Sequence, residues 1–566
     1  MFFYVNLKPD NHQKLKRFFF ILLFILYSQN HFGQNFYLKI TSDKENEVKT
    51  IDSIGYKTKH SSVKSLLDEK NLFTKQLTQL GFYDFRELES KKENDSVFSF
   101  KYSIGNQTKS IHIYIGKENE FSELFPDENP IQIPVAESEA FLNSIIKKLE
   151  TKGYSMSKVS LENIERENNF IKANLKIDTG KKRQVNNIVI NGVDKFPESH
   201  KKNLIRLYKN KVFNQQTLEK LHNDIEKYRF VKQTKYPEIL FTQDSTKIYV
   251  YLEKAKANTF DGYIGFTNDE QDKVVFSGYV DLILNNVLNS GEKLSLFWKS
   301  DGQEQRTFNL GAEIPYIFKS PFGIKANLNI FKQDSTFQNT RTALDLGYYF
   351  NYTTRAYVGY QSNESSDIQN ANTISLSDFE STFYTTGFEY TNFKIDDFLF
   401  PEKTYFEIKF GTGKRESNIE NTNQFFGNLL FRHNLYLNDK NIINIKSQNF
   451  YLQSTNYLVN ELFRFGGINS IRGFNENSLQ GNLLTSILTE YRYVLSPSLY
   501  AHSIIDYGYF KDNTSNTSDT LLGLGFGIGL QTKNGLFNLV YANGSTKEQT
   551  AKLSNSIVHI SLKANF

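Results

Sequence analysis

The pattern of apolar and polar positions changes character near residue 257. From 257 to 566, runs of roughly ten residues alternate apolar and polar side chains, which predicts β-strands. At about 19 residues for each strand with its connection, this region predicts about sixteen strands, an even number as in bacterial membrane barrels. Short connections rich in Gly, Pro, Asn and Asp predict tight turns at one end, and longer polar loops are expected at the other. The short ones are 289–292, 319–323, 437–440, 495–498 and 532–535, and the long ones include 362–375 and 511–518.

The faces of two strands can be assigned from the sequence. Val558, Ile560 and Leu562 alternate with polar residues up to the terminal Phe566, so one face suits lipid and the other a wet interior. The stretch 523–529 has glycine at every second position, which is a strand period and not the spacing of a phosphate-binding loop. Its glycine face is expected to let another segment pack closely against the inside of the wall.

Residues 36–256 carry both helical and strand patterns, arranged in three similar units. The third is the clearest. A strand pattern at 182–192 precedes two helical stretches, 198–208 and one that Asn214 caps and that runs to about residue 228. A strand at 229–235 or at 239–242 and another at 246–253 complete it. The second unit has a strand at 110–116, a helix at 137–152 and a strand at 170–177, and the first has a helix at 61–80 and a strand at 97–104. A generic α+β repeat would give the same pattern.

The chain begins with a basic stretch (Lys14, Lys16 and Arg17) followed by ten apolar residues, 18–27. That run is too short to span a bilayer and has the length of a signal-peptide core. We therefore expect residues 1–33 to be a signal peptide and the protein to be exported. Because no run of ~18 apolar residues occurs, a membrane domain would have to consist of strands.

Composition agrees with this interpretation. The 566 residues include 50 Phe, 33 Tyr and no Cys, and the mean hydropathy is only −0.49. An aromatic-rich but polar chain is typical of a membrane barrel, although a soluble β-rich protein remains an alternative. The absence of Cys excludes disulfides and thiolate metal sites. The net charge of +5 gives no reason to expect nucleic-acid binding, and no cofactor is expected.

One stretch, 462–479, fits neither helix nor strand. It contains the pair Gly466 and Gly467, and then Ile471, Arg472, Gly473 and Phe474. A loop of this length between strands is usually functional or disordered, and its glycines and aromatic residues favour a folded loop. If the loop folds into a barrel, Arg472 needs carboxylate partners.

This stretch resembles the sixth extracellular loop of the outer-membrane BamA/TamA superfamily, which carries a Val/Ile-Arg-Gly-Phe/Tyr motif. Glu490-x-Arg492 and Asp506-x-Gly508 match two strand motifs of that superfamily, and the resemblance implies that their acidic residues face the loop arginine. Strand parity agrees, because Tyr491 and Tyr507 then face lipid. Three solvated charges in an ordinary porin wall would be the alternative interpretation.

The three N-terminal units resemble POTRA domains, the periplasmic repeats of the same superfamily, and 177–192 is similar to the segment that joins two of them. The predicted fold is therefore membrane all-β: a ~16-stranded transmembrane β-barrel preceded by about three α+β POTRA domains. The expected boundaries are 1–33 (signal peptide), 34–105, 106–180 and 181–256 (POTRA-like) and 257–566 (barrel). Three repeats favour a TamA-like architecture.

The resemblance implies an outer-membrane factor that inserts or exports client proteins. Insertion would use a seam between the first strand (260–266, with Gly262 and Gly265) and the last (557–566, ending at Phe566). The expected partners are the outer-membrane bilayer, unfolded or extended clients, and accessory periplasmic or inner-membrane proteins. An exporter of one dedicated protein remains an alternative, as does a passive porin or an outer-membrane enzyme. No Gly-x-Ser-x-Gly or His-Glu-x-x-His motif occurs, so catalysis is not expected.

Overall fold

The computed structural model describes residues 35–116, 121–125, 129–167, 169–268, 274–300, 305–370, 372–532, 535–547 and 556–565. The predicted signal peptide lies outside these residues, as does Phe566. The chain divides into two units, residues 1–182 and 183–566. Within the described ranges, no helix is both long enough and apolar enough to cross a membrane.

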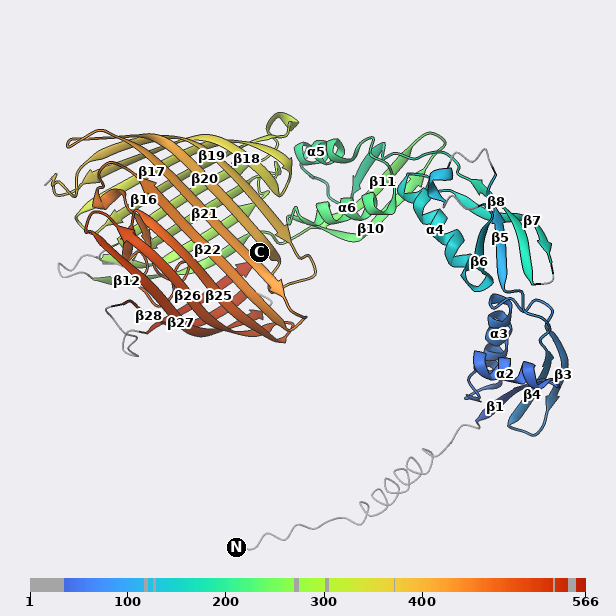
Figure 1. Cartoon of the computed structure of the whole chain (residues 1–566). Helices are drawn as coiled ribbons and strands as arrows, with labels where there is room; N and C mark the ends of the chain where they lie inside the picture. The colour runs from blue at the N-terminus through green and yellow to red at the C-terminus, as the bar shows by residue number, and fades with distance from the viewer. Residues whose placement is uncertain are drawn as a thin grey trace, which may run out of the picture. The chain divides into compact units, whose positions relative to one another are not determined.

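The first unit holds two α+β domains with the same strand plan (Figure 1). In each, the first strand pairs in parallel with the last strand, which also pairs antiparallel with the strand before it. The first domain has sheet order β2-β1-β4-β3 and the second β6-β5-β8-β7. The elements of the first are β1 (Phe36–Thr41), α2 (Glu45–Ile54), β2 (Lys59–His60), α3 (Val63–Gln79), β3 (Arg86–Lys92) and β4 (Val97–Ser103). Those of the second are β5 (Ser110–Tyr114), β6 (Ile131–Pro134), α4 (Ser138–Thr151), β7 (Lys158–Arg166) and β8 (Phe170–Asp178).

Each domain closes over its own apolar core. In the first, Leu66, Phe73 and Leu77 lie at helical spacing on α3 and are fully buried against the sheet. The Ser62 side chain caps this helix by accepting a hydrogen bond from the N–H of Ser65 at 3.2 Å. In the second, the buried face of α4 is formed by residues such as Leu149.

A third α+β domain of the same plan begins the second unit. Its elements are β9 (Asn187–Asn191), α5 (Glu198–Tyr208), α6 (Gln215–Glu226), β10 (Val231–Phe241) and β11 (Thr246–Lys254), with sheet order β10-β11-β9. Asn214 caps α6, its Oδ1 accepting from the N–H of Thr217 at 2.7 Å. The two alternative strands predicted at 229–235 and 239–242 belong to one strand, β10, because two bulges near Lys235 interrupt its alternation without ending its pairing. The three N-terminal α+β domains resemble POTRA domains.

This third domain packs against turns of the barrel through His200 on α5. The imidazole is fully buried among the rings of Tyr228, Phe230, Tyr316 and Tyr352. It also lies so close to Gly291 that a Cβ there would overlap the ring. Burial lowers the pKa of His200 to about 3, so this contact is built around a neutral imidazole.

The remaining residues form a closed barrel of sixteen strands, each paired antiparallel with its neighbours, which Figure 1 colours from green to red. The strands are β12 (Thr259–Asn268), β13 (Val274–Asn285), β14 (Lys293–Ser300), β15 (Gln305–Ile314), β16 (Phe322–Gln333), β17 (Phe337–Asn351), β18 (Thr354–Asp367), β19 (Phe379–Phe393), β20 (Glu402–Ser417), β21 (Thr422–Tyr436), β22 (Asn441–Gln453), β25 (Leu483–Ser496), β26 (Leu499–Asp512), β27 (Thr517–Thr532), β28 (Gly535–Ser545) and β29 (Ile557–Asn565). The predicted strand number and barrel are confirmed. The outward face is apolar: Val358, Phe526 and Ile560, for example, are each about 60% exposed.

Two predicted loops are wrong in extent. The polar residues 362–367 continue β18, and both Lys511 and Asp512 belong to β26, so residues 513–516 alone connect β26 to β27. Near the rim of a barrel the outward-facing residues are also polar or small, like the inward-facing ones. Hydropathy therefore does not mark where such a strand ends.

Candidate functional site in the barrel lumen

The loop between β22 and β25, the eleventh and twelfth barrel strands, is the longest connection among the described residues and is itself folded. It contains a short helical turn, η4 (Val459–Glu461), and a two-stranded ribbon of β23 (Phe463–Phe465) and β24 (Leu479–Gly481). At the end of β23, Gly466 has φ +103°, and a Cβ there would lie 2.5 Å from the carbonyl oxygen of Asn475. Gly467 adopts a similar conformation. Only glycine fits this reversal without strain, so the predicted folded loop has a local cause.

Arg472 lies at the tip of the loop and is only 6% exposed. Its Nε and Nη2 donate to the two carboxylate oxygens of Asp506 at 2.8 and 2.6 Å, and its main-chain N–H donates to the same carboxylate at 3.0 Å. Its Nη1 also forms an ion pair with Glu490. Asp506 on β26 is fully buried, and Glu490 lies on the neighbouring strand β25. The structure thus brings together the loop arginine and both carboxylates singled out in the sequence.

The ion pairs continue along the lumen through Glu490. Arg492 donates to its second oxygen from Nε at 2.7 Å and stacks over the Phe400 ring at 4.4 Å. Two guanidiniums and two carboxylates therefore balance, so the cluster holds no net charge where water is scarce. His502 lies 3.8 Å from Glu490, but Ser503 lies on the opposite face of β26, so the two do not form a catalytic pair. Among the described residues, no group of His, Cys, Asp and Glu is placed to hold a metal ion.

The loop tip lies against glycines of three adjacent strands. A Cβ on Gly508 of β26 would overlap the fully buried Ile471, and one on Gly523 of β27 would overlap the carbonyl oxygen of Arg472. On β28, a Cβ on Gly544 would lie 2.5 Å from the carbonyl oxygen of Gly473 and 2.8 Å from the Phe474 ring. The expected close approach is thus present at Gly523, whereas Gly527 and Gly529 lie against the rings of His502 and Tyr500. Gly544 was not anticipated, since Asn543-Gly544 is typical of a hairpin turn.

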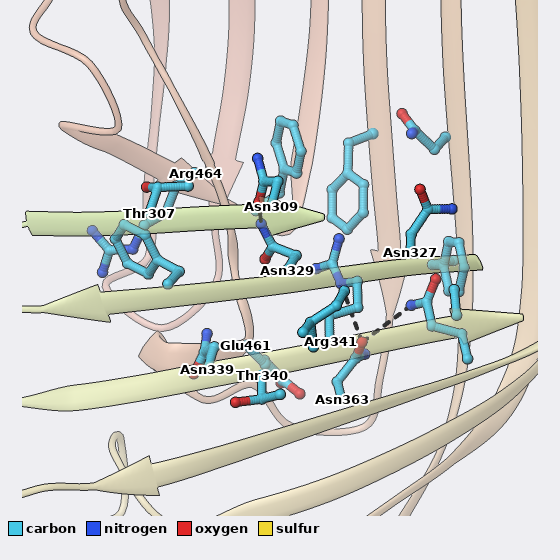
Figure 2. A pocket seen from close by; sticks show the side chains of 18 of the residues that line it. Thr307, Asn309, Asn327, Asn329, Asn339, Thr340, Arg341, Asn363, Glu461 and Arg464 are labelled. Carbon is cyan, nitrogen blue, oxygen red and sulfur yellow. Dashed lines mark hydrogen bonds between the residues drawn. The ribbon is translucent and has the colours of Figure 1, made fainter. Parts of the chain in front are cut away.

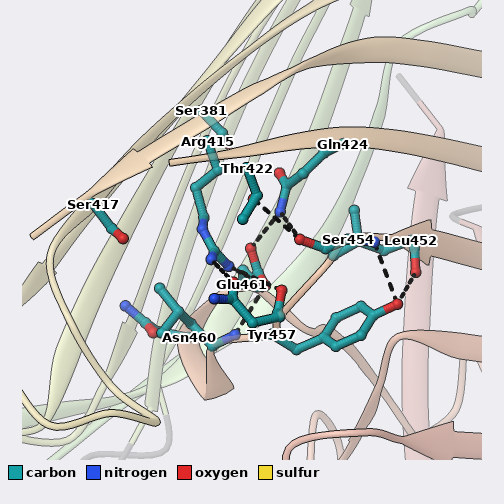
Figure 3. Close-up of polar contacts among 12 residues, drawn as sticks. Ser381, Arg415, Ser417, Thr422, Gln424, Leu452, Ser454, Tyr457, Asn460 and Glu461 are labelled. Atoms are coloured by element: carbon teal, nitrogen blue, oxygen red, sulfur yellow. Dashed lines mark hydrogen bonds and ion pairs between the residues drawn. The ribbon is translucent and has the colours of Figure 1, made fainter. Parts of the chain in front are cut away.

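A second polar cluster, which the sequence analysis missed, holds the start of the loop to the wall (Figure 3). Arg415 of β20, 1% exposed, donates from Nη1 to Glu461 Oε1 at 2.6 Å. Gln424 of β21 donates to the other carboxylate oxygen at 2.8 Å. Asn460 is also buried and donates to Ser365 and to the carbonyl oxygen of Ser377. No motif marks these residues, because Arg415 and Glu461 are 46 positions apart in a polar region.

The seam between the first and last strands is short. Only three residue pairs join β12 to β29 within the described residues, ending at Asp261 and Lys563, whereas β12 and β13 share ten and β28 and β29 share eight. Gly262 lies directly beyond the last of these three pairs and has φ +155°. Gly265 is in β12, where it pairs with Ser277 of β13. The third predicted seam residue, Phe566, is outside the described residues.

Comparisons with known proteins bear on the barrel. Residues 286–561 match the family model of the Omp85 superfamily domain. BamA from Haemophilus ducreyi lacking POTRA domains 1–3 is a similar solved structure, with 15% identity, 81% of this chain and 99% of that chain covered, and a TM-score of 0.48. CdiB from Acinetobacter baumannii is another, with 13% identity, 88% and 97% covered, and a TM-score of 0.49. A comparison with curated proteins gives no match.

Because both TM-scores are below 0.5, the family assignment rests on the family model and not on these two likenesses. The BamA/TamA superfamily expected from the sequence is the Omp85 superfamily, whereas the closer likeness to TamA stays a prediction. An Omp85 superfamily domain therefore spans residues 286–561 of this chain, within a closed sixteen-stranded barrel that POTRA-like domains precede.

Proposed function

We propose that this protein is an outer-membrane assembly and translocation factor that inserts or exports client proteins. In this proposal the three α+β domains lie in the periplasm and receive extended clients at their sheet edges. The seam between β12 and β29 then opens to pair with a client strand. Accessory periplasmic or inner-membrane proteins would deliver the clients.

The observation that carries the proposal is the short seam. Every other neighbouring pair of barrel strands shares at least eight residue pairs among the described residues, whereas β12 and β29 share three. Unpaired N–H and C=O groups along a strand edge are a template for another strand, and three pairs cost far less to separate than ten. The ion-paired loop supports the same proposal, because it fixes the wall on the β25–β28 side while the seam opens.

A cysteine lock tests the seam directly. Phe260 of β12 is directly paired with Ala564 of β29, so the double substitution Phe260→Cys with Ala564→Cys places two thiols opposite each other across the seam. The chain has no Cys of its own, so no other thiol can react. The oxidised variant, reconstituted into liposomes, should fail to insert unfolded barrel clients, and reduction should restore insertion. The matched control is Asn449→Cys with Thr485→Cys across β22 and β25, where the two side chains already touch at 2.6 Å. Full activity of the oxidised seam variant would contradict the proposal.

Export of one dedicated protein is the alternative that the same framework allows. In that case the exported chain passes through the lumen, and the disulfide across the seam would leave export unimpaired. Depleting the protein in its native host and cataloguing the outer-membrane and secreted proteins separates the two functions: many barrels disappear for an insertase, and one secreted partner disappears for an exporter.

A further inference from the structure

The lumen contains a cavity of about 730 Å³ that the ion-paired loop tip does not fill (Figure 2). Strands β15–β18 form one side of it, with Asn309, Asn329, Arg341 and Asn363 among the lining residues. Loop and wall residues including Phe463 and Phe450 also line it. A cavity of this size accommodates a ligand of drug-like or trisaccharide dimensions.

The four polar residues form one continuous row across the wall. Asn309 is directly paired with Asn329, Asn329 with Arg341, and Arg341 with Asn363, in the ladders that join β15 to β18. Directly paired residues of adjacent strands point to the same face, so all four side chains face the lumen. The arrangement is a band of side-chain amides with one guanidinium in it.

Arg341 and Arg464 both line the cavity, and the guanidinium of Arg464 lies over the rings of Phe331 and Phe337. The Nε of Arg341 donates to Asn363 Oδ1 at 3.1 Å, but among the described residues no carboxylate lies within ion-pair distance of Arg341. Arg355 and Arg415, in contrast, are each paired with a glutamate. The Arg341 side chain is exposed to the lumen, so its two terminal nitrogens are available to a ligand.

We propose that this row is a binding site for an anionic saccharide. A guanidinium recognises a carboxylate or a phosphate through two parallel hydrogen bonds. Each flanking side-chain amide can donate hydrogen bonds from its NH2 group and accept them at its oxygen. Sugar hydroxyl groups also donate and accept, so the two kinds of group match. Phenylalanine rings elsewhere in the lining offer apolar surface to the carbon–hydrogen faces of a sugar ring.

A client polypeptide fits this site less well. Extended peptides gain most of their affinity from main-chain pairing with an open sheet edge. Here the main chain of β15–β18 is fully engaged in its own ladders, so side chains alone remain for recognition. The site is separate from the seam and from the Arg472 cluster, and the inference holds whichever client function the protein has.

Isothermal titration of the purified full-length protein in detergent tests the inference with four probes. Trigalacturonic acid carries carboxylates, glucosamine 1-phosphate carries a phosphate, maltotriose is neutral, and triglutamate is an acidic peptide. Binding of either acidic sugar should weaken about tenfold or more in Arg341→Gln, as expected for a lost charged hydrogen bond. Asn329→Ala should weaken every saccharide that binds. Arg306→Gln is the matched control, because Arg306 lies on β15, two strands from β17, with its side chain on the outward face, and it should leave binding unchanged.

The relative affinities of the carboxylated and the phosphorylated sugar identify which anion the site takes. Three results overturn the proposal: no acidic sugar binds at millimolar concentration, Arg341→Gln leaves its binding unchanged, or triglutamate binds as tightly as the sugars and is lost in Arg341→Gln. The last result would assign the row to client peptides. Near-identical thermal unfolding of each variant and the parent chain shows that a loss of binding is local.

Discussion

The carboxylate of Asp506 accepts three hydrogen bonds from Arg472, one from its main-chain N–H and two from its guanidinium. The side chain and the main chain of the loop tip are therefore fixed by the same buried group. Such an arrangement specifies one position of the loop along the wall, since a shift by one residue would break all three bonds and leave Asp506 buried and unpaired.

Arg472→Lys should loosen the loop although it keeps the charge. An ammonium group cannot donate in parallel to both oxygens of Asp506 and still reach Glu490, so the docked loop should lose about 1–3 kcal/mol. Limited proteolysis of the loop measures this loss as faster cleavage. Arg464→Lys is the control, because it makes the same substitution in the same loop. Arg464 lies over the rings of Phe331 and Phe337 and does not contact Asp506. Equal cleavage of parent and Arg472→Lys would show that the fork geometry contributes nothing.

Gly544→Ala should displace the loop tip. Its Cβ would lie 2.5 Å from the carbonyl oxygen of Gly473, and main-chain atoms cannot move aside as a flexible side chain can. We expect a destabilisation of about 1–3 kcal/mol, as for overpacking in a core. Gly427→Ala is the matched change, because its Cβ would meet only the Phe410 ring, at 3.4 Å. Denaturant unfolding in micelles compares the two, and equal midpoints would refute the packing argument.

Glu461→Gln should release the start of the loop. It leaves the guanidinium of Arg415, 1% exposed, without its carboxylate, which typically costs about 3–5 kcal/mol. The double variant Arg415→Met with Glu461→Gln removes both charges and should recover part of that loss. A double variant that is less stable than Glu461→Gln alone would argue against an unpaired charge as the cause.

The contact between the third α+β domain and the barrel should weaken in mild acid. The pKa of His200 is about 3 in the folded protein and 6.5 when exposed, so the unfolded or undocked state binds the extra proton between these values. The docked state is therefore most stable above pH 6.5 and loses about 2 kcal/mol by pH 5. Comparing the rate of proteolysis of the linker near residue 256 at pH 7.5 and at pH 5 measures this loss of docking. In His200→Phe the difference attributable to this site should vanish.

Local patterns determined much of this protein because they act within one strand or helix. The alternation at Val558, Ile560 and Leu562 predicts a lipid-facing strand, and Asn214 predicts the start of α6, without reference to distant residues. The superfamily resemblance implied that Arg472 and its predicted partners face one lumen, and the alternation of side chains along the strands agreed with this. Strand ends such as Asp512 were misplaced, because polar residues in a wet lumen carry no hydropathy signal.

Only the tertiary structure decided which distant residues meet. The closed barrel brings Arg415 to Glu461 and Gly544 to Gly473, and it aligns Asn329 with Arg341 and Asn363 across three strands. Each of these contacts depends on the register between strands. Register is set by the summed pairing of whole ladders and by turn geometry, and no single residue in the sequence encodes it.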